Sequence, residues 1–369
     1  MSRDSIVPMP LRHVPWRLLL LVAAIGGFGL IVLYSAAGGS LRPWALSQGI
    51  RFILFIGLAI LISWAGEERL KAIAWPTYIV LVALLLLVEL FGFVGGGSRR
   101  WLDLGFIRLQ PSELMKPVIV LAVARFYDLL PPGQIRGWGA IWPPAVLIGL
   151  PAMLVMTQPD LGTALMICAG GITVAFLAGV PLRLFVGAGL VLATAFPIAL
   201  SMMHGYQRDR IETFLDPERD PLGAGYHIIQ SKIAIGSGGV FGKGFLAGTQ
   251  SHLDYLPERH TDFVFATMAE EWGLAGGVLL ILAFMLVIRW GMRVAGRAKS
   301  RFSRLTAAGL ATTIFFYVAI NLMMVMGLAP VVGIPLPLVS FGGSAMMTVL
   351  ICLGMLMAID RSARPAHRR

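Results

Sequence analysis

The chain has 369 residues, of which 57% are hydrophobic and 13% charged, and its mean hydropathy is +0.80. This composition excludes an ordinary water-soluble fold, because soluble domains carry roughly 25% charged residues. The formal net charge of +11 does not indicate nucleic acid, since the basic residues are scattered over loop ends instead of forming one stripe. Basic loops are typical of a membrane protein.

Sustained apolar windows predict an all-α polytopic membrane protein with about ten transmembrane helices, because a helix needs about 20 apolar residues to cross the hydrocarbon core. The windows cover residues 16–36, 44–65, 74–94, 112–129, 139–157, 161–179, 182–203, 262–290, 304–328 and 344–361. We expect a single transmembrane domain over residues 1–369. The first window is interpreted as an uncleaved helix because a second span follows it at once.

Lysine and arginine are concentrated on one side of the predicted bundle. An even number of spans places both termini on the same side, and the most basic segments on that side are residues 289–304 and the C-terminal tail. The positive-inside rule is most reliable for such short segments. We therefore expect both termini in the cytoplasm.

Residues 95–117, on the opposite side, are more than a simple connector. They contain a glycine-rich reversal followed by Arg99, Arg100 and Trp101, and then a Pro-Ser-Glu sequence typical of a helix start. This composition sets the segment apart from a simple connector, with two adjacent arginines beside Trp101.

Residues 204–261 form a long extracytoplasmic loop between the seventh and eighth predicted helices. It includes Arg208, Arg210 and a glycine-rich centre, and loops of this length are usually functional or disordered. The isoleucine spacing in residues 226–235 favours a short amphipathic helix on the membrane surface. The four histidines of the loop show no HxH or HExxH spacing, so the sequence indicates no fixed metal site.

Asp262 stands where this loop gives way to the eighth apolar window. A half-desolvated carboxylate close to Arg259 and His260 is placed to accept a proton. The alternative is a first-turn acid that stabilises the helix N-terminus, with Thr261 as another cap. Position alone does not decide between the two.

Glu270 and Glu271 lie two turns deeper in the same window. Carboxylates within a membrane are normally paired or line a wet cavity, because an uncompensated charge is costly there. The pair predicts a polar cavity in the outer leaflet, with one of the two bonded to a basic partner from another helix.

Arg51 and Lys116 are charges embedded in the second and fourth windows, and Glu113 lies one turn from Lys116. An ion-pair network across the bundle is expected from this spacing. For Arg51 and Lys116, a structural role and a substrate contact are both open.

Two further segments could border the cavity. Asp160 lies in a tight turn between the fifth and sixth windows, where a helix cap is favoured over catalysis. Residues 333–345, which include Ser340, contain two prolines and paired glycines. Such irregular backbone enters a membrane only against protein or water, so the segment is either a cavity wall or a plain connector with Ser344 as a cap.

Four stretches now resemble the signatures of one family in the expected order: "GGGSRRWLDLGFIRLQPSELMKP", "QPDLGTA", "PERHTDFVFA…AEEWG" and "PLPLVSFGGS". They look like those of the SEDS proteins (shape, elongation, division and sporulation), which are bacterial membrane glycosyltransferases. The resemblance covers essentially the whole chain. Arg259 resembles the RodA branch, because the division branch more often has a small residue there.

The resemblance implies a ten-helix enzyme that polymerises lipid II into β-1,4 glycan strands at the outer face of the bacterial cytoplasmic (inner) membrane, during cell elongation and rod-shape maintenance. It implies Asp262 as the essential acid. An inverting transfer needs one base for the acceptor 4-hydroxyl, and a carboxylate can serve. The implied partners are lipid II, the growing undecaprenyl-linked glycan, a class B penicillin-binding transpeptidase and the elongation machinery.

The departing diphosphate develops negative charge, which nearby cations would stabilise. The candidate cations are Arg51, Arg99, Arg100, Lys116, Arg208 and Arg210, with a loosely bound Mg²⁺ or Mn²⁺ as an alternative. Trp101, Arg259 and His260 complete the predicted substrate-binding set.

Two other functions would use a similar charged cavity. A lipid II flippase would carry the headgroup across the bilayer, but alternating access needs charged stations on the inner side, and the charges here cluster in the outer half. A noncatalytic scaffold for the transpeptidase would need no essential acid.

Overall fold

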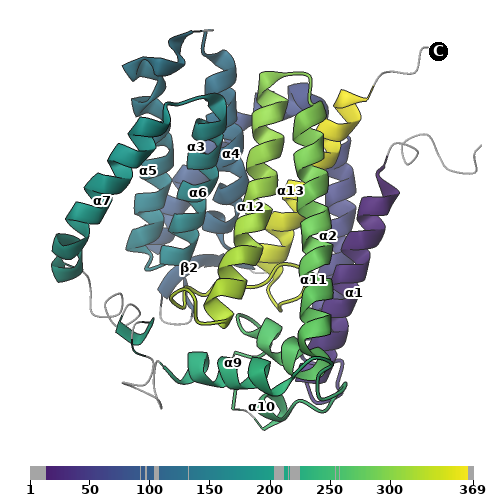
Figure 1. Ribbon diagram of the computed structural model, residues 1–369. Coiled ribbons are helices and arrows are strands. Elements are labelled where there is room, and N and C mark those ends of the chain that lie inside the picture. The colour runs from purple at the N-terminus through teal and green to yellow at the C-terminus, as the bar shows by residue number, and fades with distance from the viewer. Residues whose placement is uncertain are drawn as a thin grey trace, which may run out of the picture.

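The protein is a bundle of long helices, shown in Figure 1. The computed structural model describes residues 14–91, 93–95, 98–103, 108–131, 133–202, 212–214, 216, 225–253, 255–256 and 258–364. The long helices are α1 (Trp16–Ala36), α2 (Ala45–Ser63), α3 (Gly66–Phe91), α4 (Pro111–Leu129), α5 (Trp142–Thr157), α6 (Leu161–Ala178), α7 (Leu182–Met202), α11 (Val264–Arg297), α12 (Arg301–Val325) and α13 (Gly343–Ala363). Each predicted window overlaps one of them, although the window 74–94 runs past the end of α3 into the strand Phe93–Gly95.

Two helices extend much farther than their predicted windows. α3 begins at Gly66 instead of residue 74, and α11 ends at Arg297 instead of residue 290. Both extensions carry charge, and Glu67 forms an ion pair with Lys71 over 2.7 Å in the first turns of α3. Charged turns lower the local hydropathy while the backbone stays helical, so apolar windows end before the helices do.

Among the described residues, eight helices are long and apolar enough to cross a bilayer. The chain is therefore a membrane protein. The apolar part of α7 is shorter, Leu182–Ala195, and α4 contains two acidic and two basic residues. The count of ten spans, the single domain over residues 1–369 and the cytoplasmic termini stay predictions.

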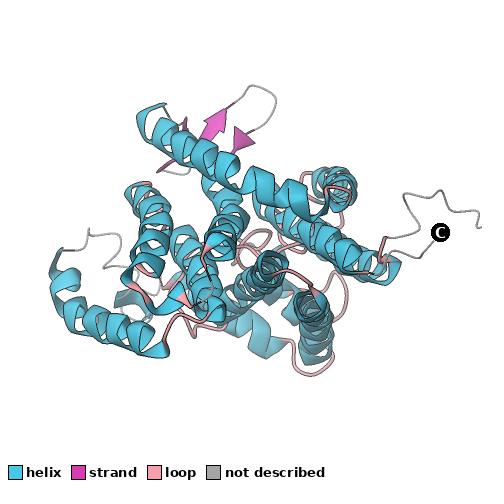
Figure 2. Cartoon of the chain, turned by 90° about the horizontal axis from the view of Figure 1, so that it is seen from above, coloured by secondary structure: helices cyan, strands magenta, loops and turns pink. Residues whose placement is uncertain are grey.

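The most buried helices lie at the centre of the bundle. Buried residues make up 67% of the apolar window of α12 and 78% of that of α13, but only 22% of that of α2. α4 packs against α3, α6 and α12, while α13 packs against α2. Figure 2 shows the bundle from above, turned by 90° from the view of Figure 1. Several polar side chains on these helices are consequently buried, among them Glu113 and Lys116 of α4, Asn321 of α12 and Thr348 of α13.

The predicted helical fold class is confirmed, but a small antiparallel sheet that was not predicted follows α3. Its strands are β1 (Phe93–Gly95), β2 (Ser98–Asp103) and β3 (Arg108–Leu109), in the order β1-β2-β3. Figure 2 shows them at one edge of the bundle. Gly95 pairs with Ser98 and Val94 with Arg99, so the predicted glycine reversal lies between two strands.

The described part of the segment 204–261 contains α9 (Tyr226–Ser237) and α10 (Thr249–His252). α9 is the short helix expected over residues 226–235. Figure 1 shows it lying across the end of the bundle at which α11 begins. Its buried residues Ile228, Ser231 and Ala234 pack against protein, because α9 contacts α11 and α12. The Ser231 hydroxyl also donates to the Val325 carbonyl oxygen over 2.7 Å.

Candidate functional site

Asp262 lies in the turn that precedes α11, and its main chain is fixed from α12. The Asn321 amide donates to the Asp262 carbonyl oxygen over 2.9 Å and to that of Ile334 over 2.7 Å. A Cβ placed on Gly333 would lie 3.4 Å from Asp262 Oδ2. The half-buried carboxylate therefore faces the irregular segment between α12 and α13.

The Thr261 hydroxyl, which was considered as a helix cap, points back along the chain. It donates to Glu258 Oε2 over 2.6 Å. The Glu258 carbonyl oxygen also accepts from the amides of Thr261 and Phe263, each over 3.2 Å. Residues 258–263 thus form a hydrogen-bonded turn that presents Asp262.

An aromatic and cationic stack lies beside this turn. The rings of Trp44 and His260 are parallel within 10° with centroids 4.1 Å apart, and the Arg259 Cζ atom lies 5.6 Å from the Trp44 ring centroid. On the other side, Phe341 lies 5.9 Å from His260, and Arg51 Cζ lies 5.3 Å from the Phe341 centroid. We call these five residues the outer stack. It joins α2, the turn before α11 and the segment before α13, and it contains three of the predicted substrate-binding residues.

His260 lies inside the outer stack and is half-buried. Burial lowers its pKa below the ordinary 6.5, with a smaller lowering by Arg259 and an opposing effect of Glu258. The imidazole is therefore neutral at neutral pH. Its backbone oxygen accepts from the Phe341 amide over 2.7 Å, which anchors the turn to the α13 side. His260 provides a flat neutral surface, and the cations of the stack are the two arginines.

Glu113 and Lys116 meet in the centre of the bundle. Lys116 Nζ lies 2.5 Å from Glu113 Oε1 and donates to the Tyr317 hydroxyl over 2.9 Å. The Tyr317 hydroxyl in turn donates to the other Glu113 oxygen. Lys116 is 1% exposed and Glu113 6%. We call these three residues the inner triad; it ties α4 to α12, and the Thr348 hydroxyl adds α13 by donating to the Glu113 carbonyl oxygen.

Asp160 caps α6, as its turn position favours. Its Oδ1 accepts from the Thr163 amide over 3.1 Å, and its Oδ2 accepts from Gln110 over 3.2 Å. Arg100 Nη1 lies 4.0 Å from Asp160 Oδ2, and the same guanidinium donates to the carbonyl oxygens of Gln158 and Pro159. Asp160 and Arg100 therefore hold β2 against the α5–α6 turn.

Ser340 shapes the segment between α12 and α13. Its hydroxyl accepts from the Leu336 amide over 2.8 Å, its amide donates to the Leu336 carbonyl oxygen over 2.9 Å, and its carbonyl oxygen accepts from Gln48 over 2.7 Å. The Ser340 side chain is only 2% exposed. Its hydroxyl therefore holds the turn of residues 336–340 in place.

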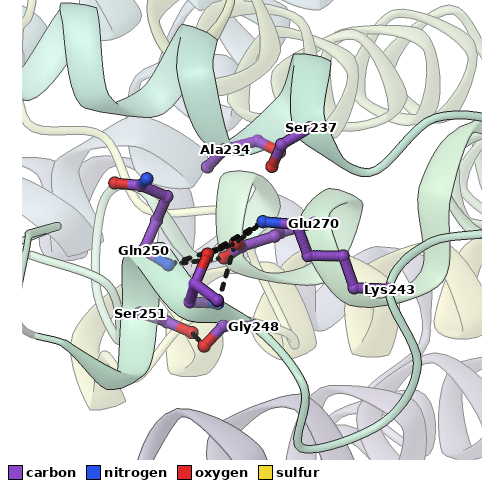
Figure 3. A network of polar contacts seen from close by, with 8 residues as sticks. Ala234, Ser237, Lys243, Gly248, Gln250, Ser251 and Glu270 are labelled. Carbon is purple, nitrogen blue, oxygen red and sulfur yellow. Dashed lines mark hydrogen bonds and ion pairs between the residues drawn. The ribbon is translucent and has the colours of Figure 1, made fainter.

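Glu270 and Glu271 are both buried on α11 but contact different segments. Glu270 Oε1 accepts from Lys243 Nζ over 2.6 Å and from the Thr249 amide over 2.8 Å, as Figure 3 shows for the surrounding network. Glu271 Oε1 accepts from the Ser35 hydroxyl of α1. The basic partner expected from another helix comes instead from the segment between α9 and α10.

The remaining predicted substrate-binding residues are Trp101, Arg99, Arg208 and Arg210. Trp101 is half-buried on β2, opposite Phe93. Arg208 and Arg210 lie outside the described residues, as does the side chain of Arg99. Their predicted contacts with substrate stay predictions.

Sequence reasoning missed several residues that build the site: Trp44, Gln48, Lys243, Tyr317 and Asn321. Gln48 and Asn321 are polar residues within apolar windows, and that signal could have singled them out, because such residues are costly in a membrane. Trp44 and Lys243 carry no comparable local signal, since their partners lie more than a hundred residues away or across a loop.

Asp262 and the outer stack together place an acid beside two cations. The Asp262 carboxylate stands at the N-terminal end of α11, and the outer stack, with an arginine at each end, lies against the same turn. Such an arrangement suits proton abstraction by the carboxylate and stabilisation of an anionic group by the guanidiniums.

The sequence of this chain is similar to those of known proteins over nearly its whole length. The family model of the FtsW/RodA/SpoVE cell cycle proteins matches residues 15–365. The chain belongs to this family. Peptidoglycan glycosyltransferase MrdB of Escherichia coli K12 is 45% identical over 353 residues, which are 94% of this chain and 93% of the relative. The probable peptidoglycan glycosyltransferase FtsW of Trichlorobacter lovleyi is 34% identical, over 97% of this chain and 96% of its own.

Solved structures agree with the fold of this FtsW/RodA/SpoVE family member. A chain of a peptidoglycan synthase complex superposes with a TM-score of 0.79 at 36% identity, over 95% of this chain and 98% of that one. The rod shape determining protein RodA of Thermus thermophilus superposes with a TM-score of 0.72 at 31% identity, over 96% and 98%. The predicted resemblance to this family is confirmed.

Proposed function

We propose that this chain is a peptidoglycan glycosyltransferase that polymerises lipid II into β-1,4 glycan strands at the outer face of the bacterial cytoplasmic membrane. The observation that carries the proposal is the half-buried Asp262 carboxylate, held at the outer end of α11 beside the outer stack. The relatives named peptidoglycan glycosyltransferase support it over nearly the whole chain.

Asp262 serves as the general base in the proposed reaction. It takes the proton of the acceptor 4-hydroxyl while that oxygen attacks the anomeric carbon of the donor, and the bond to the diphosphate breaks on the opposite face. One inversion converts the α-linked donor to a β-linked product, so one base is enough. Arg51 and Arg259, at the two ends of the outer stack, stabilise charge on the departing diphosphate.

A divalent cation, Mg²⁺ or Mn²⁺, belongs to the proposal as an additional stabiliser of the diphosphate. Among the described residues, no three His, Cys, Asp or Glu side chains gather into a group. Mg²⁺ is commonly held by one or two carboxylates together with substrate phosphates. Chelation with EDTA, followed by addition of Mg²⁺ or Mn²⁺, tests this part separately.

The proposed partner is a class B penicillin-binding transpeptidase within the elongation machinery. The structural neighbour from a synthase complex that coordinates polymerisation and cross-linking supports such a partner. The neighbour named as rod shape determining supports the elongation branch, in agreement with Arg259.

The test is polymer formation by the purified protein, in complex with its transpeptidase, from lipid II resolved on a gel. Wild type should form glycan polymer, and Asp262→Asn should form about 10²–10⁴-fold less, the usual contribution of acid–base catalysis. Glu68→Gln, on an exposed side chain of α3, is the control. Transport of lipid II without polymer would favour the flippase, and an intact complex with neither activity would favour the scaffold.

A further inference from the structure

Helix α11 is interrupted at Gly273, whose φ of 64° and ψ of −164° lie outside the helical region. A helix broken there leaves amides and carbonyls on both sides of the break without their usual i→i+4 partners. Segment 239–244 supplies the replacements. The amides of Lys243 and Gly244 donate to the carbonyls of Glu270 and Glu271 over 2.9 and 3.1 Å, and the carbonyls of Gly239 and Val240 accept from Leu274 and Ala275 over 2.9 and 3.0 Å. The segment is thus joined to α11 through its backbone.

The Glu270 side chain then caps the next element, α10. The N-cap of α10 is Gly248, which has no side chain to accept from the first amides of the helix. Glu270 Oε1 replaces it by accepting from the amides of Thr249 and Gln250 over 2.8 and 3.0 Å. Figure 3 shows these contacts together with Lys243, whose ammonium lies 2.6 Å from the same oxygen. A carboxylate at a helix N-terminus stabilises it.

Gly248 is required by the close approach of this carboxylate. A Cβ at residue 248 would lie 3.1 Å from Glu270 Oε2 and 2.7 Å from Ser251 Oγ. A larger residue would therefore crowd the cap and force these side chains to shift. The sequence places glycine where Glu270 must reach the start of α10.

The position of α10 in turn fixes the Arg259 side chain. The buried Ser251 carbonyl oxygen, in the middle of α10, accepts from Arg259 Nη1 over 2.6 Å. The Arg259 carbonyl oxygen accepts from the Thr267 hydroxyl over 3.2 Å, and its guanidinium lies over Trp44. The direction of the guanidinium is therefore set by where α10 lies.

We propose that Glu270 is a positioning residue for the glycosyl transfer: it fixes α10, and through the Ser251 carbonyl it orients the Arg259 guanidinium three residues before Asp262. The inference rests on the proposed function, because it assigns Arg259 to the substrate. It explains why a fully buried carboxylate with 0% exposure is present at all. An ion pair that contains a buried charge is weak evidence for a role in stability, and the contacts of Glu270 with the first amides of α10 give it a role in placing that helix.

A double-mutant cycle tests the chain of contacts. Polymerisation is measured for wild type, Glu270→Gln, Arg259→Ala and the double variant, each in the transpeptidase complex with lipid II. We expect Glu270→Gln to lower kcat about tenfold to hundredfold, the range for a small misplacement of a substrate-orienting group. In the Arg259→Ala background, Glu270→Gln should cause no further loss, because the group it orients is gone.

Two variants from the same neighbourhood complete the design. Ser237→Ala removes only a hydrogen bond to Ala234 within α9 and should leave the rate unchanged. Gly248→Ala crowds Glu270 Oε2 and Ser251 Oγ without changing a charge, so it should lower the rate in the same direction as Glu270→Gln. If Glu270→Gln does not fold as judged by complex formation, Gly248→Ala replaces it in the cycle.

These measurements distinguish failure of the proposed glycosyltransferase function from failure of the positioning role of Glu270. Absence of polymer from wild type would overturn the proposed function itself. Polymer from wild type, with losses from Glu270→Gln and Arg259→Ala that multiply in the double variant, would overturn only the positioning role. A rate for Glu270→Gln equal to that of Ser237→Ala, or an unaffected Arg259→Ala, would also overturn it.

Discussion

The inner triad and the outer stack are both charged groups within one apolar bundle, but they differ in how their partners are arranged. In the inner triad, Lys116, Glu113 and Tyr317 bond to one another, and each is at most 6% exposed. In the outer stack, Arg51 is exposed on α2 and lies against an aromatic ring. A charge in an apolar window therefore does not by itself indicate a substrate site.

This comparison predicts opposite consequences for substitutions in the two groups. A change in the inner triad should act on stability first, because it leaves a buried charge behind. A change at the outer stack should act on the reaction first, because the backbone around it is held by other contacts.

The largest expected effect on stability comes from Lys116→Met. It leaves Glu113 buried with its cation removed, and breaking a buried pair in this way costs about 3–5 kcal/mol. Thermal unfolding of the purified protein in detergent measures the loss. The double variant Lys116→Met with Glu113→Gln should recover part of it, because no charge then stays buried. If Lys116→Met had unchanged stability but formed no polymer, Lys116 would be a substrate-binding residue, and the structural role of the inner triad would be contradicted.

A smaller effect, on rate alone, is expected from Arg51→Ala. Polymerisation should fall about tenfold, less than for a sole electrostatic donor, because Arg259 remains. The unfolding free energy should change by no more than about 0.5 kcal/mol, as for other exposed substitutions. Arg289→Ala, an exposed arginine of α11 on the predicted cytoplasmic side, is the matched control. Equal rates for the two variants would remove Arg51 from the site.

The smallest effect concerns pH and His260. Its folded-state pKa is lowered below 6.5 by burial, so above pH 6.5 both folded and unfolded states are neutral at this group. As the pH falls below 6.5, the unfolded state binds the proton first, and stability is lost until the folded-state pKa is reached. Wild type should therefore lose more thermal stability than His260→Phe between pH 7.5 and the lower pH at which both still fold. Parallel curves for the two proteins would contradict a neutral stacked imidazole.

Much of the fold follows from local sequence. Hydropathy located the long helices, because about 20 apolar residues in a row have few alternatives to spanning. It failed at the first turns of α3, where Glu67 and Lys71 stay helical despite their charge. The strands β1 to β3 were also missed, because short pairings depend on a turn geometry that a hydropathy window does not register.

The candidate site was predictable only in part. Asp262, Arg259 and Glu270 were singled out as charges at the border of an apolar run, which is a local signal. Their partners were not, because the stacking of Trp44 on His260 joins residues 216 positions apart, and the capping of α10 by Glu270 depends on the break at Gly273. Such contacts are fixed by packing between segments, which a single sequence does not display.

The most direct test of the account is polymer formation from lipid II by Asp262→Asn, measured on the same transpeptidase complex as its thermal unfolding midpoint. If Asp262 is the base, the midpoint should be unchanged and polymer should fall by about 10²–10⁴-fold, which is the behaviour of a group that acts on substrate. Polymer equal to that of wild type, from a complex with an unchanged midpoint, would contradict the assignment of Asp262 as the base.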